Sequence, residues 1–555
     1  MATTFSAVGS PTSSVVAGRY AGALVVLLLA LLGYLVFKQL TELVVRDAPD
    51  HVFVWCGLLA LLAGALSRAK NADLPLFARR GLGACAVFLT LYAALEPFDI
   101  PYAAVPLDSP QVLFHSQARW VALGFAVLGW WRPAGAMASA LLIWMMRDLQ
   151  SGLTGFYFSN LDIRNVVEAI TLVSLAAGLV GSMRHAPRVS QALALNQDAV
   201  ARGLLLVFAA AIGGHLGNYF YSGVAKIMLD GGPLSWVLDN RLYDGIPGAL
   251  EKGTLLTAAF PALTQAEYDL FKALSVPMNF VALIAQLLAV AAPLRRRWLI
   301  WITIAYDIFH LSVYLALGLL FWKWIALNTI ILTTLLALKD EQWDKAARLT
   351  CLACALVGTA FFHTATLAWY DTPGFTSVYF EAALKNGKRV RIPNAYFLSS
   401  SYQVSQGRLW WPGGMEHFNH SIWGSVLHYD DALAGRTCTP PVRSMPAEPL
   451  YGPPAAVGEY VQAQHRKALQ RIDARGRFNY YLVPHHHVPS PFVADPFYRV
   501  DKRDIATYFI VNDSVCLPLD HGRLKRRVIM RDETPVYDAM RDRVIGDEHA
   551  TTPDA

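Results

Sequence analysis

The stretch Gly213-Gly-His-Leu-Gly-Asn-Tyr-Phe-Tyr-Ser-Gly-Val-Ala-Lys226 closes an apolar run, residues 201–226, that is long enough to cross a bilayer. A lysine therefore ends what otherwise has the pattern of a membrane helix. Because an ammonium group is costly in hydrocarbon, Lys226 is either a functional group or a side chain whose amine reaches the headgroups. His215, Ser222 and Lys226 are separated by seven and four residues, so they share one helix face. Such a polar stripe must face protein or a water-filled cavity.

The composition of the chain indicates a membrane protein. Of its 555 residues, 55% are hydrophobic and only 16% are charged, whereas soluble domains carry about 25% charged residues. Apolar stretches recur from residue 21 to residue 369, and the rest of the chain is ordinary polar sequence. The net charge of +6 comes with arginines and lysines in loops and does not call for a nucleic-acid partner. We therefore expect a polytopic α-helical membrane bundle with a C-terminal extramembrane α+β domain, and the lipid bilayer as its surroundings.

The apolar stretches predict about eleven membrane helices, several of them shorter than the roughly 20 residues of a perpendicular span. They cover residues 21–45, 52–66, 81–95, 120–131, 134–146, 166–183, 201–226, 271–292, 298–320, 325–338 and 349–369. The predicted domains are an N-terminal tail (1–20), a transmembrane domain (21–370) and a mixed α/β domain (371–555).

The basic residues predict the orientation of these helices. They gather in the loops at 68–80, 184–188, 295–297 and 339–348, which all lie on the side of the N-terminus if there are eleven spans. Basic loops face the cytoplasm, so the N-terminus should be cytoplasmic and the domain after Asp371 extracytoplasmic, in an inner or plasma membrane. The first twenty residues lack a basic n-region and a clear cleavage site, so the first helix is expected to remain as a signal anchor.

The cysteines fall into two groups. Four lie within apolar spans, where a small buried hydrophobe is the usual role; they are Cys56, Cys85, Cys351 and Cys354. Cys438 and Cys516 are the only cysteines of the C-terminal domain. A pair of this kind in an oxidising compartment predicts a disulfide bond.

The C-terminal domain carries hairpin, strand and helix signals. Asn386-Gly387 between two strand-like runs, from Ser377 and from Arg389, predicts a hairpin because both turn residues need a positive φ. A helix is expected at 457–474 and further strands at 508–511 and 526–530. The domain is also rich in histidine, at His417, His420, His428 and residues 485–487 beside Glu416. Their spacing matches no metal motif, so solvated or hydrogen-bonded histidines are the better interpretation and no metal site is predicted.

A second apolar segment carries an acid and a base. Asp307 and His310 lie three residues apart in an apolar run, so they share a helix face and could pair within the membrane. Two helices with buried ionisable groups indicate a site more strongly than one. Asp307 and His310 would then supply a counter-charge for Lys226.

These two segments resemble a known family. Tyr221-Ser-Gly-Val-Ala-Lys226-Ile, Leu234-Ser-Trp236 and Arg241-Leu-Tyr243 are similar to the signature of the HTTM-type membrane domain, which the vitamin K-dependent γ-glutamyl carboxylases share. The segment from Phe309-His310 to Phe321-Trp322 resembles a later helix of that family. The recognisable motifs cover residues 201–338.

The resemblance implies an active site at the extracytoplasmic membrane edge. There Lys226 would be the general base that deprotonates a naphthohydroquinone, and the oxygenated quinone would take a proton from a peptide or protein substrate before carboxylation. Two motifs depart from the carboxylase pattern: Ala225 replaces the first lysine, and Ser159-Asn-Leu-Asp162 stands where the carboxylases have Asn-His. The candidate catalytic residues are Lys226, His215, Asp307 and His310, and the candidate quinol-binding residues are Tyr219, Tyr221, Ser222 and Trp236.

Two other classes of function remain open. A polytopic glycosyl or lipid-group transferase would use an acidic residue in an extracytoplasmic loop, for which Asp47, Asp50, Glu96 and Asp99 are placed suitably, although loop acids are usually solvated. A non-catalytic membrane scaffold or transporter subunit would bind a partner protein through its C-terminal domain.

Overall fold

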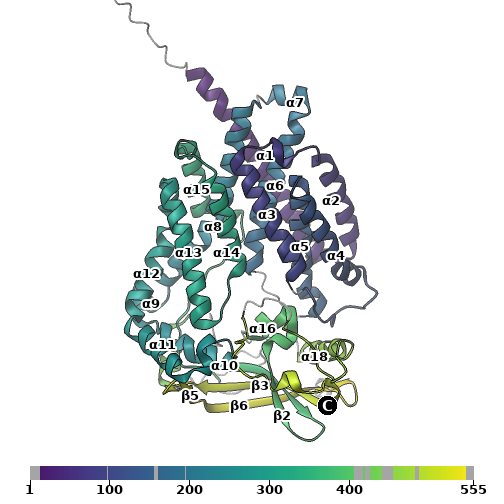
Figure 1. Cartoon of the computed structure of the whole chain (residues 1–555), viewed down its shortest axis with the longest axis vertical. Helices are drawn as coiled ribbons and strands as arrows, with labels where there is room; N and C mark the ends of the chain where they lie inside the picture. Colours follow the sequence, from purple (N-terminus) through teal and green to yellow (C-terminus); the bar gives the residue numbers. More distant parts are fainter. Residues whose placement is uncertain are drawn as a thin grey trace, which may run out of the picture.

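The computed structural model describes residues 13–96, 98–155, 161–193, 195–405, 417–418, 426–439, 454–481 and 487–545. A bundle of helices stands on a C-terminal sheet, which closes one end of the bundle (Figure 1). The first half of the bundle consists of α1 (Ser13–Asp47), α2 (Val52–Leu66), α3 (Leu76–Leu95), α4 (Pro110–Leu128), α5 (Pro133–Thr154), α6 (Leu161–Arg184), α7 (Pro187–Ala192) and α8 (Gln197–Ile227). The second half consists of α9 (Ser235–Asp239), α10 (Gly245–Lys252), α11 (Pro261–Ala273), α12 (Ser275–Leu287), α13 (Arg296–Leu317), α14 (Trp322–Leu336) and α15 (Lys345–Val357).

Helix α8 is the centre of the bundle. It packs against α1, α6, α12 and α15, and most of its side chains are buried. A helix that is apolar on all sides has to be surrounded by other helices or by lipid. The polar positions of α8 can therefore be satisfied only by other parts of the protein.

Six of the described helices are long and apolar enough to cross a membrane. They cover Ala21–Asp47, Pro49–Leu66, Leu76–Leu95, Ile163–Arg184, Gln197–Ile227 and Arg296–Leu317. A seventh span results if α11 and the helix after it are counted together, although the two are bent by 67°. The predicted number of about eleven spans is not confirmed, because helices such as α14, with 15 residues, are short for a perpendicular crossing.

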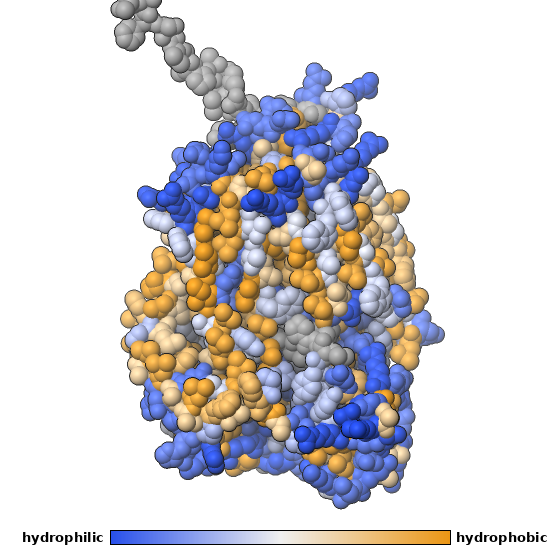
Figure 2. Space-filling view, in the orientation of Figure 1, coloured by the Kyte–Doolittle hydropathy of each residue, from blue (hydrophilic) through white to orange (hydrophobic). Residues whose placement is uncertain are grey.

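The surface of the bundle has the pattern of a membrane protein. Hydrophobic side chains gather along the height of the bundle, while hydrophilic side chains cover its two ends (Figure 2). Leu61, Trp301 and Ile308 are among the large apolar side chains that face outward from this part of the structure. Lipid tails are the surroundings that such side chains require.

The basic loops contact one another in two groups. Arg132 donates to the carbonyl oxygen of Ser67 at 2.7 Å, and Arg184 donates to the carbonyl oxygen of Asp73 at 3.4 Å. Arg296 pairs with Asp340 at 2.6 Å. Helix α7, which follows Arg184, lies at the end of the bundle away from the sheet (Figure 1). Which end of the bundle faces the cytoplasm stays a prediction.

The C-terminal region is built on a five-stranded antiparallel sheet of order β2-β1-β3-β6-β7. The strands are β1 (Gly374–Leu384), β2 (Arg389–Ile392), β3 (Ile505–Cys516), β6 (Arg527–Asp538) and β7 (Arg543–Val544), and β4 (Leu519–Asp520) and β5 (Arg523–Leu524) form a separate hairpin. The predicted hairpin is confirmed as β1 and β2, but of its two expected turn residues only Gly387 has a positive φ, at +81°, while Asn386 does not. The helix expected at 457–474 is α18 (Pro454–Leu469), which ends five residues earlier.

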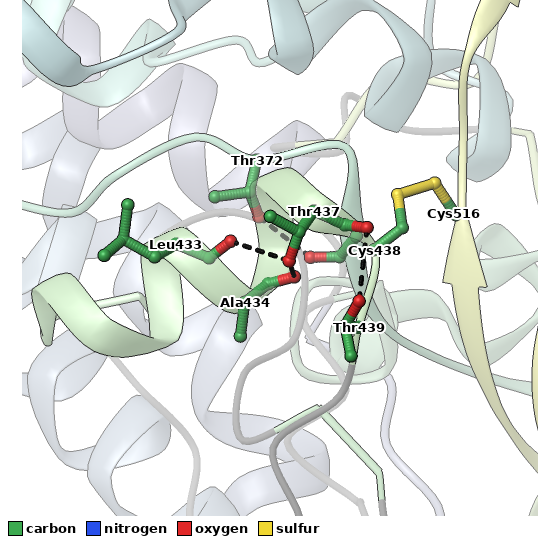
Figure 3. Close-up of a disulfide and its surroundings, with 8 residues drawn as sticks. Thr372, Leu433, Ala434, Thr437, Cys438, Thr439 and Cys516 are labelled. Atoms are coloured by element: carbon green, nitrogen blue, oxygen red, sulfur yellow. Dashed lines mark hydrogen bonds between the residues drawn. A yellow bond between two sulfur atoms is a disulfide. The ribbon is translucent and has the colours of Figure 1, made fainter.

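The predicted disulfide is present. Cys438 follows α17 (Tyr429–Thr437) and is bonded to Cys516 at the end of β3, with the two Cα atoms 5.6 Å apart (Figure 3). The bond ties the short helix to the central strand of the sheet. The described cysteines of the bundle are free thiols, as expected for packing residues; they are Cys56, Cys85, Cys351 and Cys354.

Candidate functional site

Lys226 lies in the last turn of α8 and is only 6% exposed. Its ammonium group donates to the carbonyl oxygen of Leu367 and, at 3.4 Å, to the carbonyl oxygen of Ser222. It also lies 4.8 Å from the ring centroid of Trp236 on α9, a cation–π distance. The indole N–H of Trp236 in turn donates to the carbonyl oxygen of Trp369 at 2.8 Å. Lys226 is therefore fixed inside the protein and does not extend along the helix end to the headgroups.

The polar stripe of α8 binds an extended segment, residues 363–371, which we call the strap. Asn218 accepts a hydrogen bond from the backbone N–H of Ala365 at 2.7 Å, and Ser222 accepts one from Leu367 at 3.0 Å. Lys226 donates to the carbonyl oxygen of the same leucine. Non-helical backbone is tolerated at membrane depth only where the protein satisfies its hydrogen bonds. Asn218, Ser222 and Lys226, spaced four residues apart on α8, do this for the strap.

Both ends of the strap are also bonded to side chains. The backbone N–H of His363 donates to Glu168 at 2.7 Å, and that of Asp371 donates to Asn240 at 2.7 Å. Glu168 itself pairs with Lys38 at 3.2 Å and with Arg164 at 3.0 Å. The strap thus joins a buried ionic cluster at one end to the loop after α9 at the other.

A separate polar cluster lies nearer to the N-terminus of α8. His215 contacts the Asn328 side chain at 3.0 Å, and the Asn328 amide donates to Asp307 at 2.8 Å and to the Tyr219 hydroxyl at 3.2 Å. The Tyr219 hydroxyl also contacts His310 at 3.0 Å. Asn328, on α14, connects all these groups, and the sequence reasoning missed it. A lone amide inside an apolar run was the signal that could have found it.

The structure therefore divides the predicted site in two. Lys226 contacts both Ser222 and Trp236, whereas His215, Tyr219, Asp307 and His310 belong to the cluster around Asn328. Asp307 is linked to His310 through Asn328 and Tyr219 and belongs to that cluster, apart from Lys226. Tyr221 points elsewhere, with its hydroxyl donating to the carbonyl oxygen of Leu356. Of the segment Ser159-Asn-Leu-Asp162, which stands where the carboxylases have Asn-His, Ser159 and Asn160 lie outside the described residues, and α6 begins at Leu161.

Two carboxyl groups outside the helices complete the surroundings of Lys226. Burial raises the pKa of Asp371 to about 7, which the indole N–H of Trp369, at 3.2 Å, and the Lys226 ammonium oppose. Asp244, just before α10, is 5% exposed. Burial raises its pKa to about 8, and the negative charge of Asp371 acts in the same direction. The negative charge of Asp371 in the strap therefore acts on Lys226, whereas Asp307 accepts a hydrogen bond from Asn328.

Four acidic residues were candidates for a transferase site, and three of them pair with a basic side chain. Glu96 is buried and pairs with Arg147 at 2.6 Å and with Lys323 at 3.0 Å. Arg147 also donates to Ser399 at 2.9 Å, which links this ionic cluster to the C-terminal region. Asp99 pairs with Lys467 and Arg471, and Asp47 pairs with Arg46, while Asp50 is exposed.

The described histidines of the C-terminal region have separate partners. His417 contacts Ser514 at 2.8 Å, His428 contacts Asp230 at 3.2 Å, and the backbone of His487 forms a β-bridge with Leu319. No group of three or more candidate metal ligands occurs within the described part of the chain. Glu416, His420, His485 and His486 lie outside it.

The resemblance to the HTTM-type domain rests on the motifs around Lys226 and His310. No protein-family model, curated protein or solved structure matches this chain.

Proposed function

We propose that this chain is an integral membrane enzyme in which Lys226 is the general base for a quinol at the membrane edge. The observation that carries the proposal is the buried amine of Lys226, held against the face of Trp236 at the end of a helix long enough to span the bilayer. The resemblance to the carboxylases assigns the same role to the matching lysine. A peptide or protein at the extracytoplasmic domain is the second substrate that this resemblance implies.

The residues around Lys226 fit a quinol head group in two respects. The face of Trp236 provides an aromatic surface beside the amine, and Leu234 and Leu238 expose apolar side chains on either side of it in sequence. A bound quinol would supply an acidic hydroxyl group. The chain's own part is to hold and move the proton: Nζ of Lys226, in its unprotonated form, accepts it, and the Asp371 carboxylate balances the resulting ammonium.

Substitutions of Lys226 test this role in the purified full-length protein with a naphthohydroquinone. We expect the wild type to bind and consume the naphthohydroquinone, and Lys226→Met to bind it without consuming it. Lys226→Arg should fail as well, because guanidinium stays protonated and cannot accept a proton. A Lys226→Arg protein that turns over the naphthohydroquinone overturns the proposal.

Lys252 offers a matched control. It also donates to a backbone carbonyl, that of Val378 at 3.1 Å, and burial lowers its pKa to about 7. Lys252→Met removes a similar contact away from Trp236, so it should lower thermal stability while leaving turnover per folded molecule unchanged. Equal loss of turnover in Lys252→Met and Lys226→Met would show that the effect on activity comes from folding alone.

A second candidate function, a non-catalytic membrane scaffold, is favoured by one observation. The Lys226 ammonium already contacts the carbonyl oxygens of Leu367 and Ser222 and the ring of Trp236. In that role Lys226 holds the strap, and Lys226→Met lowers the melting temperature. Wild-type protein that yields no bound quinone on extraction and co-purifies with a stoichiometric protein partner would establish the scaffold.

A further inference from the structure

Helix α11 has an apolar face that the protein does not cover. Phe260, Leu263, Leu270 and Leu274 follow one another at helical spacing, and all four are exposed, with Leu270 56% exposed. Asp269 and Lys272 are also exposed, but helical spacing places them toward the side of Tyr268 and Gln265 and not on this face. An exposed apolar face on a helix whose charged residues lie elsewhere is typical of a helix in the membrane interface.

The opposite face of α11 packs on the protein. Thr264 is buried, the ring of Tyr268 lies 5.3 Å from that of Tyr243, and Gln265 accepts a hydrogen bond from the backbone N–H of Gly522 at 2.8 Å. Gly522 belongs to the β4–β5 hairpin of the C-terminal region. Helix α11 therefore rests on that region with one face and leaves its apolar face outward.

A loop of the C-terminal region extends the same apolar surface. Phe492 is 56% exposed, its neighbour Val493 is also exposed, and the ring of Phe492 lies 5.8 Å from that of Phe260. The loop is fixed at the end of a candidate span, because the N–H of Val488 donates to the carbonyl oxygen of Gly318 at 3.0 Å.

The exposed apolar surface of the bundle continues along α13 to the end where the Phe492 loop is bonded. Helix α13 ends at Leu317, and its exposed side chains reach Leu315, two residues before the end. Helix α11 is bent by 67° from the helix after it, so it turns away from the direction of a span. Hydrophobic surface also continues over the region that α9 and α11 occupy (Figures 1 and 2).

We propose that α11 and the Phe492 loop form a membrane-contact surface, made by Phe260, Leu263, Leu270, Leu274, Phe492 and Val493. This surface inserts into the boundary between headgroups and acyl chains on the side of the C-terminal region. The bilayer is favoured over a protein partner because the surface is continuous with the apolar belt of the bundle. It holds the C-terminal region against the membrane. The proposal does not depend on the chemical role of Lys226.

Fluorescent labels at single cysteines test this contact in the full-length protein. The background carries alanine in place of the four free thiols and keeps the Cys438–Cys516 bond, whose retention by mass spectrometry reports folding; those thiols are Cys56, Cys85, Cys351 and Cys354. Leu270→Cys and Phe492→Cys are labelled with the fluorophore NBD in vesicles of phosphatidylcholine and phosphatidylglycerol. We expect both labels to be quenched by lipids with a nitroxide near the headgroup and to be protected from iodide in the water.

Two control positions calibrate the quenching. Ile308, 61% exposed in the middle of α13, should be quenched by a nitroxide placed deeper in the acyl chain. Met540, 68% exposed in the turn before β7, is also an apolar surface residue but lies next to Arg541 and two residues after Asp538, so a label there should be quenched by iodide. The proposal is overturned if the labels at Leu270 and Phe492 behave like that at Met540. It is also overturned if they resist both quenchers, because a protein partner or a second copy then covers the surface.

Discussion

Asp244 shows how a single buried carboxyl affects this protein. Its Oδ2 atom has no hydrogen-bond partner among the described residues, and burial raises the pKa of the group from 3.8 to about 8. An acid with a raised folded-state pKa keeps its proton in the folded protein while the unfolded chain loses it. Folding is therefore penalised increasingly as the pH rises from about 4 to about 8, and the penalty is complete above that range.

Asp244→Asn should remove this penalty with little change in shape. We expect the variant to melt at a higher temperature than the wild type above pH 8, and the gap to shrink as the pH falls toward 4. The free-energy difference grows by about 1.4 kcal/mol for each pH unit between the two pKa values, as an upper bound. Thermal unfolding in detergent at several pH values measures the gap. A gap that does not change with pH would show that Asp244 is not protonated in the folded protein.

For single residues, the sequence predicted which polar side chains are buried but not which groups they contact. It indicated that His215, Ser222 and Lys226 face protein, and all three are buried. It could not indicate that Lys226 binds Leu367, because the two residues are 141 positions apart. Periodicity reports which face of a helix is polar, while the segment that meets this face depends on the whole fold.

Among the elements, the strap depends most clearly on side chains for its backbone hydrogen bonds. Asn218 accepts from the backbone of Ala365 and from the side-chain amide of Asn165, the latter at 3.0 Å. Asn218→Leu keeps the volume but leaves both donors buried without an acceptor. Each such loss costs about 1–3 kcal/mol. We expect a lower melting temperature together with faster hydrogen exchange at the Ala365 amide.

Thr303→Val is the control for this substitution. The Thr303 hydroxyl is buried and donates only to the carbonyl oxygen of Leu299 in its own helix, so its removal leaves no backbone N–H unpaired. It should change stability by less than Asn218→Leu does. If the two variants are equally stable and the exchange at Ala365 is unchanged, the strap does not need the stripe of α8.

The limits of the sequence prediction also appear in the element boundaries. The predicted spans at 120–131 and 134–146 are parts of α4 and α5, which extend to residues 110 and 154. The polar residues of α5 ended the apolar run too early, because Arg147 is buried in an ion pair with Glu96 that the sequence does not show. Likewise, the predicted span at 271–292 crosses the bend at Leu274, where both helices are apolar and periodicity does not change.

For the whole molecule, the structure brings together basic loops that the sequence predicted to lie on the same side of the membrane. Of the four basic loops expected on one side, the loop at 68–80 contacts the loop at 184–188 through Arg184 and Asp73, and the loop at 295–297 contacts the loop at 339–348 through Arg296 and Asp340. The sheet lies at the opposite end from α7 (Figure 1). From the positive-inside rule we predict that the α7 end faces the cytoplasm and the sheet faces the outside, where a disulfide is stable.

This topology depends on α15, because it is the last α-helix before the strap and has only 13 residues. At 1.5 Å per residue it is about 20 Å long, less than the hydrocarbon thickness of about 30 Å. We nevertheless expect the chain to change sides between Leu338 and Asp371, since α15, the short helix after it and the strap together run along α8. Phosphatase and fluorescent-protein fusions after Leu338 should report the cytoplasm, and fusions after Asp371 should report the outside. If both positions report the same side, the odd number of spans is wrong, and the Cys438–Cys516 bond would then lie in a reducing compartment, where such bonds are rare.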